Sequence, residues 1–165
     1  MESIVATGSF EMADVSEDLL TLAQRAYRLN ATNNVVSISK EKLRQELERL
    51  DHPVAHLDFE AFNLPFHPTS GLKTCEMVPF QSSIHLENAD GTLTHHEFLC
   101  DHRFDDRYAL VAHLVEKLAD VGSIITWNVS FERRMLRHLA ENFPEFAEAL
   151  ESIILKLVDL SLIHI

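Results

Sequence analysis

The hydrophobic positions of the central part of the chain follow the two-residue period of β-strands. Residues 54–59 form a largely apolar run that predicts a strand buried on at least one face. Residues 78–86 alternate between apolar and polar side chains, and residues 88–91 (Asn-Ala-Asp-Gly) have the composition of a turn. Residues 93–99 are then predicted to return as the partner strand. These segments predict one strand followed by a β-hairpin.

Helical spacing dominates the rest of the chain. Apolar residues recur at helical intervals in 15–29, which follows a capping-box pattern at Asp14–Glu17, and in 40–50. Towards the C-terminus the pattern predicts segments in the following order: a helix at 105–120, a short strand at 123–127, a helix at 130–142, a further short helix from Pro144, and an apolar segment at 153–160.

The order of these elements predicts an α/β fold. A hairpin followed by alternating strands and helices favours a mixed β-sheet, with an antiparallel hairpin and parallel strands, flanked by helices. We expect residues 53–165 to form this domain and residues 1–52 to form a helical N-terminal extension.

Composition narrows the functional classes. At 46% hydrophobic residues the chain can bury a core, and its two cysteines exclude a disulfide framework. A formal net charge of −12 argues against a passive nucleic-acid-binding module but leaves room for an enzyme that binds phosphates through metal ions. The apolar runs are too short for a membrane span and no signal peptide is recognisable, so we expect a cytoplasmic protein.

Asp58 and Glu60 are the first candidates for chemistry. Residues two apart on a strand point to the same face, so the two carboxylates should project together at the end of an apolar strand. Paired carboxylates repel each other, and a divalent cation such as Mg²⁺ or Mn²⁺ removes this repulsion. The alternative is a chance match, because a motif of two acidic residues is short.

A second candidate lies where the predicted strand 123–127 gives way to a helix. Asn128 turns the chain, Ser130 begins the helix, and Glu132 falls in its first turn, beside the carboxyl edge of the sheet. We expect Glu132 to face Asp58 and Glu60 across a shared cleft. The alternative is that Ser130 only caps the helix and Glu132 only complements its dipole.

Taken together, the two motifs resemble the first two motifs of the DEDD-type 3′–5′ exonucleases, which have a ribonuclease H-like fold. His56-Leu-Asp-Phe-Glu-Ala-Phe, Val78-Pro-Phe-Gln, Trp127-Asn-Val-Ser-Phe-Glu and Val158-Asp-Leu look more closely like an uncharacterised bacterial domain family assigned to that superfamily. The resemblance implies metal-dependent hydrolysis at a DNA or RNA 3′ end, with Mg²⁺ or Mn²⁺ as cofactor. It implies that Asp58, Glu60 and Glu132 are catalytic metal ligands, Glu132 standing where most relatives have aspartate. It also suggests substrate contacts from Phe62, Gln81, Asn128 and Asp159.

The resemblance also implies a third motif, a His or Tyr followed by a fourth carboxylate on a late helix. Only six residues follow Asp159, and the last of them resemble a translated adapter tail. We therefore expect a C-terminally truncated fragment with little activity of its own, whose full-length parent can carry an additional nuclease or helicase domain. The alternative function is a non-catalytic ribonuclease H-like module that binds nucleic acid or a protein partner.

Three arginines, Arg133, Arg134 and Arg137, follow Glu132 on the predicted helix. Their side chains either contact phosphate groups or form an ordinary solvated helix face. The sequence leaves this choice open.

Overall fold

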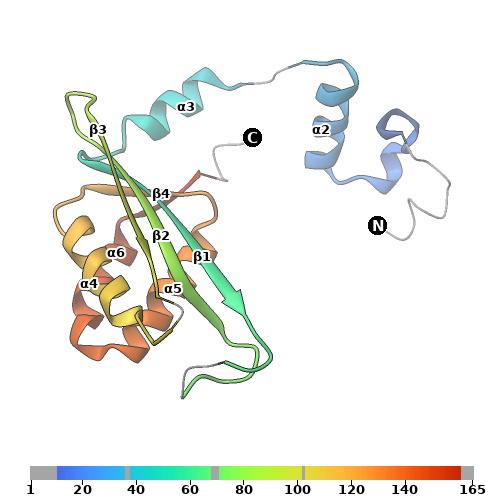
Figure 1. The fold of residues 1–165 in the computed structure, drawn as a ribbon. Helices are drawn as coiled ribbons and strands as arrows, with labels where there is room; N and C mark the ends of the chain where they lie inside the picture. Colours follow the sequence, from blue (N-terminus) through green and yellow to red (C-terminus); the bar gives the residue numbers. More distant parts are fainter. Residues whose placement is uncertain (1–10, 36–37, 68–70, 102, 161–165) are drawn as a thin grey trace. The chain divides into compact units, whose positions relative to one another are not determined.

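The computed structural model describes residues 11–35, 38–67, 71–101 and 103–160. The chain divides into two compact units, Met1–Glu41 and Lys42–Ile165 (Figure 1). The division falls inside the expected N-terminal extension, and helix α3 (Lys40–Leu47) crosses it. The tail after Leu160, where we expect a truncated reading frame to end, lies outside the described residues.

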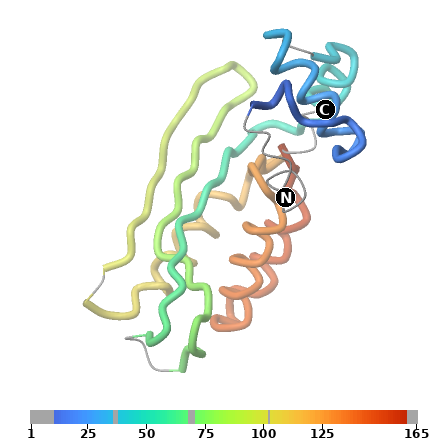
Figure 2. Tube along the Cα trace, turned by 90° about the vertical axis from the view of Figure 1, so that its right-hand side faces the viewer, coloured from blue at the N-terminus to red at the C-terminus, as the bar shows by residue number. Residues whose placement is uncertain are grey.

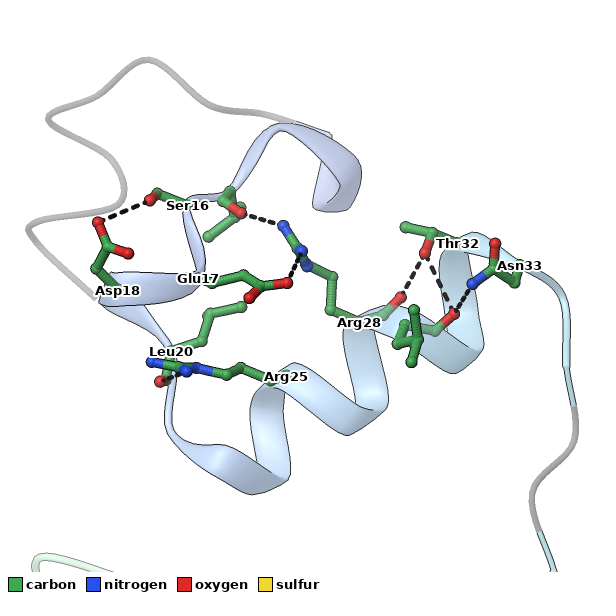
Figure 3. Close-up of polar contacts among 10 residues, drawn as sticks. Ser16, Glu17, Asp18, Leu20, Arg25, Arg28, Thr32 and Asn33 are labelled. Carbon is green, nitrogen blue, oxygen red and sulfur yellow. Dashed lines mark hydrogen bonds and ion pairs between the residues drawn. The ribbon is translucent and has the colours of Figure 1, made fainter.

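The first unit begins its helix later than the sequence pattern predicts. Two short 3₁₀ turns, η1 (Met12–Asp14) and η2 (Glu17–Leu19), precede α2 (Leu22–Thr32). The capping box is formed by Thr21 and Gln24, whose side chains each accept the other's backbone N–H. The predicted box at Asp14–Glu17 is wrong. Glu17 instead forms an ion pair of 2.7 Å with Arg28, which holds η2 against α2 (Figure 3).

The second unit contains a five-stranded mixed sheet with the strand order β3-β2-β1-β4-β5. The strands are β1 (Val54–Asn63), β2 (Met77–Glu87), β3 (Leu93–Leu99), β4 (Ser123–Thr126) and β5 (Leu157–Asp159). The first three strands are antiparallel neighbours, whereas β1, β4 and β5 run parallel. The predicted hairpin and the α/β class with a mixed sheet are confirmed. The first strand is four residues longer than predicted, and the apolar segment 153–160 is divided between a helix end and β5.

Helices cover one face of this sheet. They are α4 (Arg107–Leu118), α5 (Val129–Asn142), the turn η3 (Pro144–Phe146) and α6 (Ala147–Leu155), and Figure 2 shows α5 and α6 on one side of the strands. The core between helices and sheet contains side chains with no solvent exposure from both layers: Ala55, Ile84, Ile124, Leu110, Leu114, Leu136, Leu139 and Leu150. Among the described residues, no helix has the length and apolar character needed to cross a membrane.

Strand β1 has two different faces. Ala55, Leu57 and Phe59 are buried in the core, whereas the residues between them, His56, Asp58 and Glu60, are exposed. A register shift between Glu60 and Ala61 ends this regular alternation. The sheet therefore has a helix-covered face and an open face, and Asp58 and Glu60 lie on the open one.

The start of β4 is held against the segment before β1. Gly122 donates its backbone N–H to the Pro53 carbonyl oxygen at 2.8 Å, and the Asp51 N–H donates to the Ser123 hydroxyl at 2.9 Å. A Cβ atom at Gly122 would lie 2.3 Å from the Asp51 carbonyl oxygen, a distance that real contacts do not reach. Glycine is therefore required here by close backbone approach.

We expect Gly122→Ala to lower the free energy of unfolding by about 1–3 kcal/mol, because the two backbone segments must move apart. The measurement is the urea midpoint of the purified protein. Gly91→Asn is the matched control: this turn residue has φ +81°, a Cβ atom added to it would meet nothing within 4 Å, and asparagine tolerates this conformation. Equal stability of Gly122→Ala and the wild type would contradict the close approach.

Candidate functional site

The carboxyl ends of the short parallel strands lie beside the middle of β1. His56 is the last β1 residue in register with β4, opposite Ile125, and Asp58 lies two residues further along the strand. On the other side of β4, Thr126 pairs with Asp159 of β5. Parallel strands that end together place the groups that follow them at one edge of the sheet. Asp58 and Asp159 therefore flank the end of β4.

Helix α5 begins immediately after β4 at this edge. Asn128 is its N-cap, and the Asn128 side-chain oxygen accepts the backbone N–H of Ser130 at 3.2 Å. Glu132 lies in the first turn and is 3% exposed, so its carboxyl group is buried where the helix meets the sheet. The sequence-based alternative assigned the capping role to Ser130. In the structure Asn128 fills it.

Glu132 is a buried acid in unfavourable surroundings. Burial is the largest cause that raises the pKa of its carboxyl group, and the negative charges of Asp58 and Asp159 raise it further. The backbone N–H of Glu132 and the nearby Thr126 hydroxyl lower the pKa in part. Among the described residues, neither Oε2 of Glu132 nor Oγ1 of Thr126 has a partner that meets hydrogen-bond geometry. A buried carboxylate oxygen without a donor is costly, and a cation would satisfy it.

Asp58 opens to a groove of about 590 Å³ on the open face of the sheet. Its carboxylate accepts the backbone N–H of Phe59 at 3.1 Å. The groove is lined by residues of three strands, β1, β2 and β4, and by the residues that directly follow β4 and β5: His56, Leu57, Asp58, Ser83, His85, Ile125, Thr126, Trp127 and Leu160. Trp127 is 61% exposed and offers a large aromatic surface there. A groove with an aromatic wall, polar side chains and a carboxylate can hold a nucleotide.

The predicted acidic residues are brought together only in part. Asp58 and Asp159 are close enough to Glu132 for their negative charges to raise the pKa of its carboxyl group. Glu60 is exposed on the same face of β1 as Asp58 and is paired in register with Gln81. In the described part of the chain, the residues that line the groove include Asp58 but neither Glu60 nor Glu132. Glu132 reaches this edge from the helix-covered side.

The residues predicted to contact the substrate lie in different parts of the domain. Asn128 and Asp159 lie at the edge just described, whereas Phe62 lies four residues beyond Asp58 on β1 and stacks on Phe80 with ring centroids 5.6 Å apart. Gln81 is half-buried on β2. Sequence reasoning did not single out Thr126, whose position immediately before the Trp127-Asn128 turn was the available signal.

No preformed metal cage is present in the described ranges. Within residues 11–35, 38–67, 71–101 and 103–160, no group of three or more His, Cys, Asp or Glu side chains is arranged to hold a metal ion. The site is better described as a buried carboxyl group with two acidic neighbours.

We expect Glu132→Gln to be more stable than the wild type near pH 7.5, by roughly 1 kcal/mol, because it removes a charge from a buried position. The direction of this change follows from the link between proton binding by Glu132 and the free energy of unfolding. The folded state holds the Glu132 proton more tightly than the unfolded chain, so wild-type stability falls as the pH rises above the ordinary glutamate pKa. The difference should vanish near about pH 3, where Glu132 is protonated in both the folded and the unfolded state.

Urea unfolding of both proteins at the two pH values measures this difference. Glu148→Gln on α6, which replaces an exposed carboxylate, is the control and should show little change at either pH. A Glu132→Gln protein that is less stable than the wild type at both pH values would contradict the unfavourable burial.

The comparisons with known proteins give a family for most of this unit. Residues 55–164 match the family described as a domain of unknown function, DUF2779. None of the curated proteins and none of the solved structures compared with the chain matches it. The matched range contains the whole sheet from Ala55 onward, the three helices and both acidic motifs. The chain belongs to the DUF2779 family.

Proposed function

We propose that this domain is a ribonuclease H-like, metal-dependent phosphodiester hydrolase that acts at the 3′ end of DNA or RNA. One observation carries the proposal: the buried Oε2 of Glu132, without a partner among the described residues, lies beside two further carboxylates at the carboxyl edge of the parallel strands. The resemblance of the Asp58-Phe-Glu60 and Asn128–Glu132 segments to the DEDD exonucleases supplies the reaction. The mixed sheet is compatible with the proposed fold.

The residues at this edge fit a divalent cation. Mg²⁺ and Mn²⁺ prefer carboxylate oxygens and keep coordination positions for water and phosphate. Asp58 and Glu132 are the side chains that would hold the ion, with Asp159 and Glu60 adding negative charge nearby. When bound, such ions lower the pKa of water and stabilise the leaving oxygen of a phosphodiester.

The chain's own residues would position the substrate. Trp127 and His85 line the groove beside Asp58, so a terminal base can stack there while its phosphate points to the carboxylates. The buried half of the site, around Glu132 and Thr126, excludes water from one side. This arrangement suits a flexible single-stranded end, because an unpaired base is free to stack on the aromatic wall.

We expect Mn²⁺ to bind the protein and to raise its melting temperature, since it offsets the repulsion around Glu132. Asp58→Asn and Glu132→Gln should each weaken Mn²⁺ binding by at least about tenfold in titration calorimetry. Asp120→Asn, which replaces an exposed carboxylate after α4, is the charge-matched control and should bind like the wild type. Equal Mn²⁺ affinity in all four proteins would exclude the metal site.

For the reaction, we expect a protein that carries this domain together with the third-motif His or Tyr and carboxylate to shorten a 5′-labelled single-stranded oligonucleotide stepwise from its 3′ end in the presence of Mn²⁺. Asp58→Asn should reduce the rate at least about 100-fold, because it removes a metal ligand. A 3′-phosphorylated oligonucleotide is the substrate control. Tight oligonucleotide binding without shortening would favour the non-catalytic module instead.

A further inference from the structure

A second groove, of about 550 Å³, lies along α5 and is distinct from the one beside Asp58. Its floor is one face of the helix, with Ser130, Arg133, Arg134, Arg137 and His138. Glu76 and Met77, at the start of β2, form the opposite wall. We call it the arginine groove.

The guanidinium groups of this groove are not neutralised by carboxylates of the described residues. Arg134 donates to the Sδ atom of Met77 at 3.2 Å and lies over the ring of Phe131, 5.8 Å from its centroid. For Arg133 and Arg137, the structure records no hydrogen bond or ion pair with any residue that it describes. Positive charge gathered in this way is unexpected in a chain with a net charge of −12.

In the part of the chain that the structure describes, the two acidic residues that line the arginine groove, Glu76 and Glu141, form no ion pair with its arginines. Glu76 accepts the backbone N–H of Lys73, and its Oε1 lies 3.2 Å from Nδ1 of His138. These contacts hold the Glu76 carboxylate at the wall and lower its pKa. Glu141 is exposed at the far end, one turn after Arg137, and no ion pair joins the two within the described residues.

A buried hydrogen-bond network supports the wall of the groove at Glu76. Arg107 is 7% exposed, and its guanidinium donates two hydrogen bonds of 2.7 Å to Asp105 and lies 3.2 Å from Nε2 of His138. The Asp105 carboxylate therefore balances the charge of Arg107. Both ring nitrogens of His138 have partners, Nδ1 with Glu76 and Nε2 with Arg107. His138 therefore orients Glu76, and the arginines of α5 are the residues available to bind a ligand in the groove.

We propose that the arginine groove binds the phosphate groups of a nucleic-acid strand. The choice of nucleic acid rests on the proposed function, whereas the site itself rests on the arginines. Arg133 and Arg137 are four residues apart, about 6 Å along the helix axis, so each can bind a different phosphate. Guanidinium groups bind phosphate in a bidentate manner, and the N-terminal end of α5 at Ser130 adds favourable partial charge.

The arginine groove and the buried carboxyl group of Glu132 lie on different sides of the same helix. Glu132 and Arg133 are neighbours in the first turns of α5, with Glu132 turned to the sheet and Arg133 to the groove. Phosphate binding by the arginines needs no metal ion.

The test is fluorescence anisotropy of a labelled single-stranded oligonucleotide of about 12 nucleotides, measured in EDTA over roughly 50–200 mM salt. We expect the Arg133→Ala/Arg137→Ala protein to bind at least about tenfold more weakly at the lowest salt. The slope of log K against log salt should fall by about 0.7 for each lost phosphate contact. Retained melting temperature shows that the variant is folded.

Arg44→Ala/Arg49→Ala removes the same charge at and after α3 and is the matched control, expected within about twofold of the wild type. An oligonucleotide affinity and salt slope unchanged by Arg133→Ala/Arg137→Ala, or reduced equally by the control, would overturn the proposal. The two proposals fail separately because this binding is measured in EDTA: weaker binding by Arg133→Ala/Arg137→Ala, with no Mn²⁺-dependent shortening by the wild-type protein that also carries the third motif, would support the arginine groove and contradict the hydrolase.

Discussion

The packing of α4, α5 and α6 against a single face of the sheet is the constraint on which the other features of this domain depend. The apolar layer between them is fully buried, with Ile84 and Ile124 from the sheet and Leu136 and Leu139 from α5 at no exposure. Interiors of this density leave little freedom for sliding. The core therefore fixes where the first turn of α5 lies relative to the ends of β4 and β5, and it leaves the opposite face of the sheet open.

This packing buries Glu132 and destabilises the charged form of its carboxyl group. A helix that buries Met135, Leu136 and Leu139 also buries the residue three positions before Met135, because these positions share one face. Asp58 and Asp159 then add repulsion to the loss of hydration. An apolar residue at this position would make the domain more stable, and a buried acid is consistent with the stability that functional sites commonly give up.

Helix α5 separates two kinds of chemistry on two faces. Its buried face presents a carboxyl group to the sheet edge, and its outer face presents arginines along a groove whose wall is braced by the Arg107–His138–Glu76 network. The carboxylates that we propose to hold a metal ion and the arginines that we propose to bind phosphate must be kept apart, since direct ion pairs would neutralise both. The helix keeps them apart by directing neighbouring residues, Glu132 and Arg133, to different sides.

The sequence alone determined the local periods and the breaks between elements. The alternation in β2 and the turn composition of Asn-Ala-Asp-Gly after it specified the hairpin, and the exposed positions of Asp58 and Glu60 followed from the two-residue period of β1. In α2 local signals competed, and Thr21 with Gln24 capped the helix although Asp14 with Glu17 has the same spacing. No local signal predicted that Phe62 stacks on Phe80 or that Gln81 pairs with Glu60, because both contacts depend on the pairing of β1 with β2.

Only the tertiary structure determined which acidic residues lie close together. Asp58, Glu132 and Asp159 come from three segments far apart in the chain, and their interaction depends on the parallel order β1-β4-β5. The surroundings of Glu132 Oε2 and of the Arg133 and Arg137 guanidinium groups likewise depend on what other segments bring near them. Periodicity reports which face a residue occupies, because that is a local property of the backbone. Which residues pack against that face is determined by contacts between segments far apart in the sequence. No local pattern encodes these contacts.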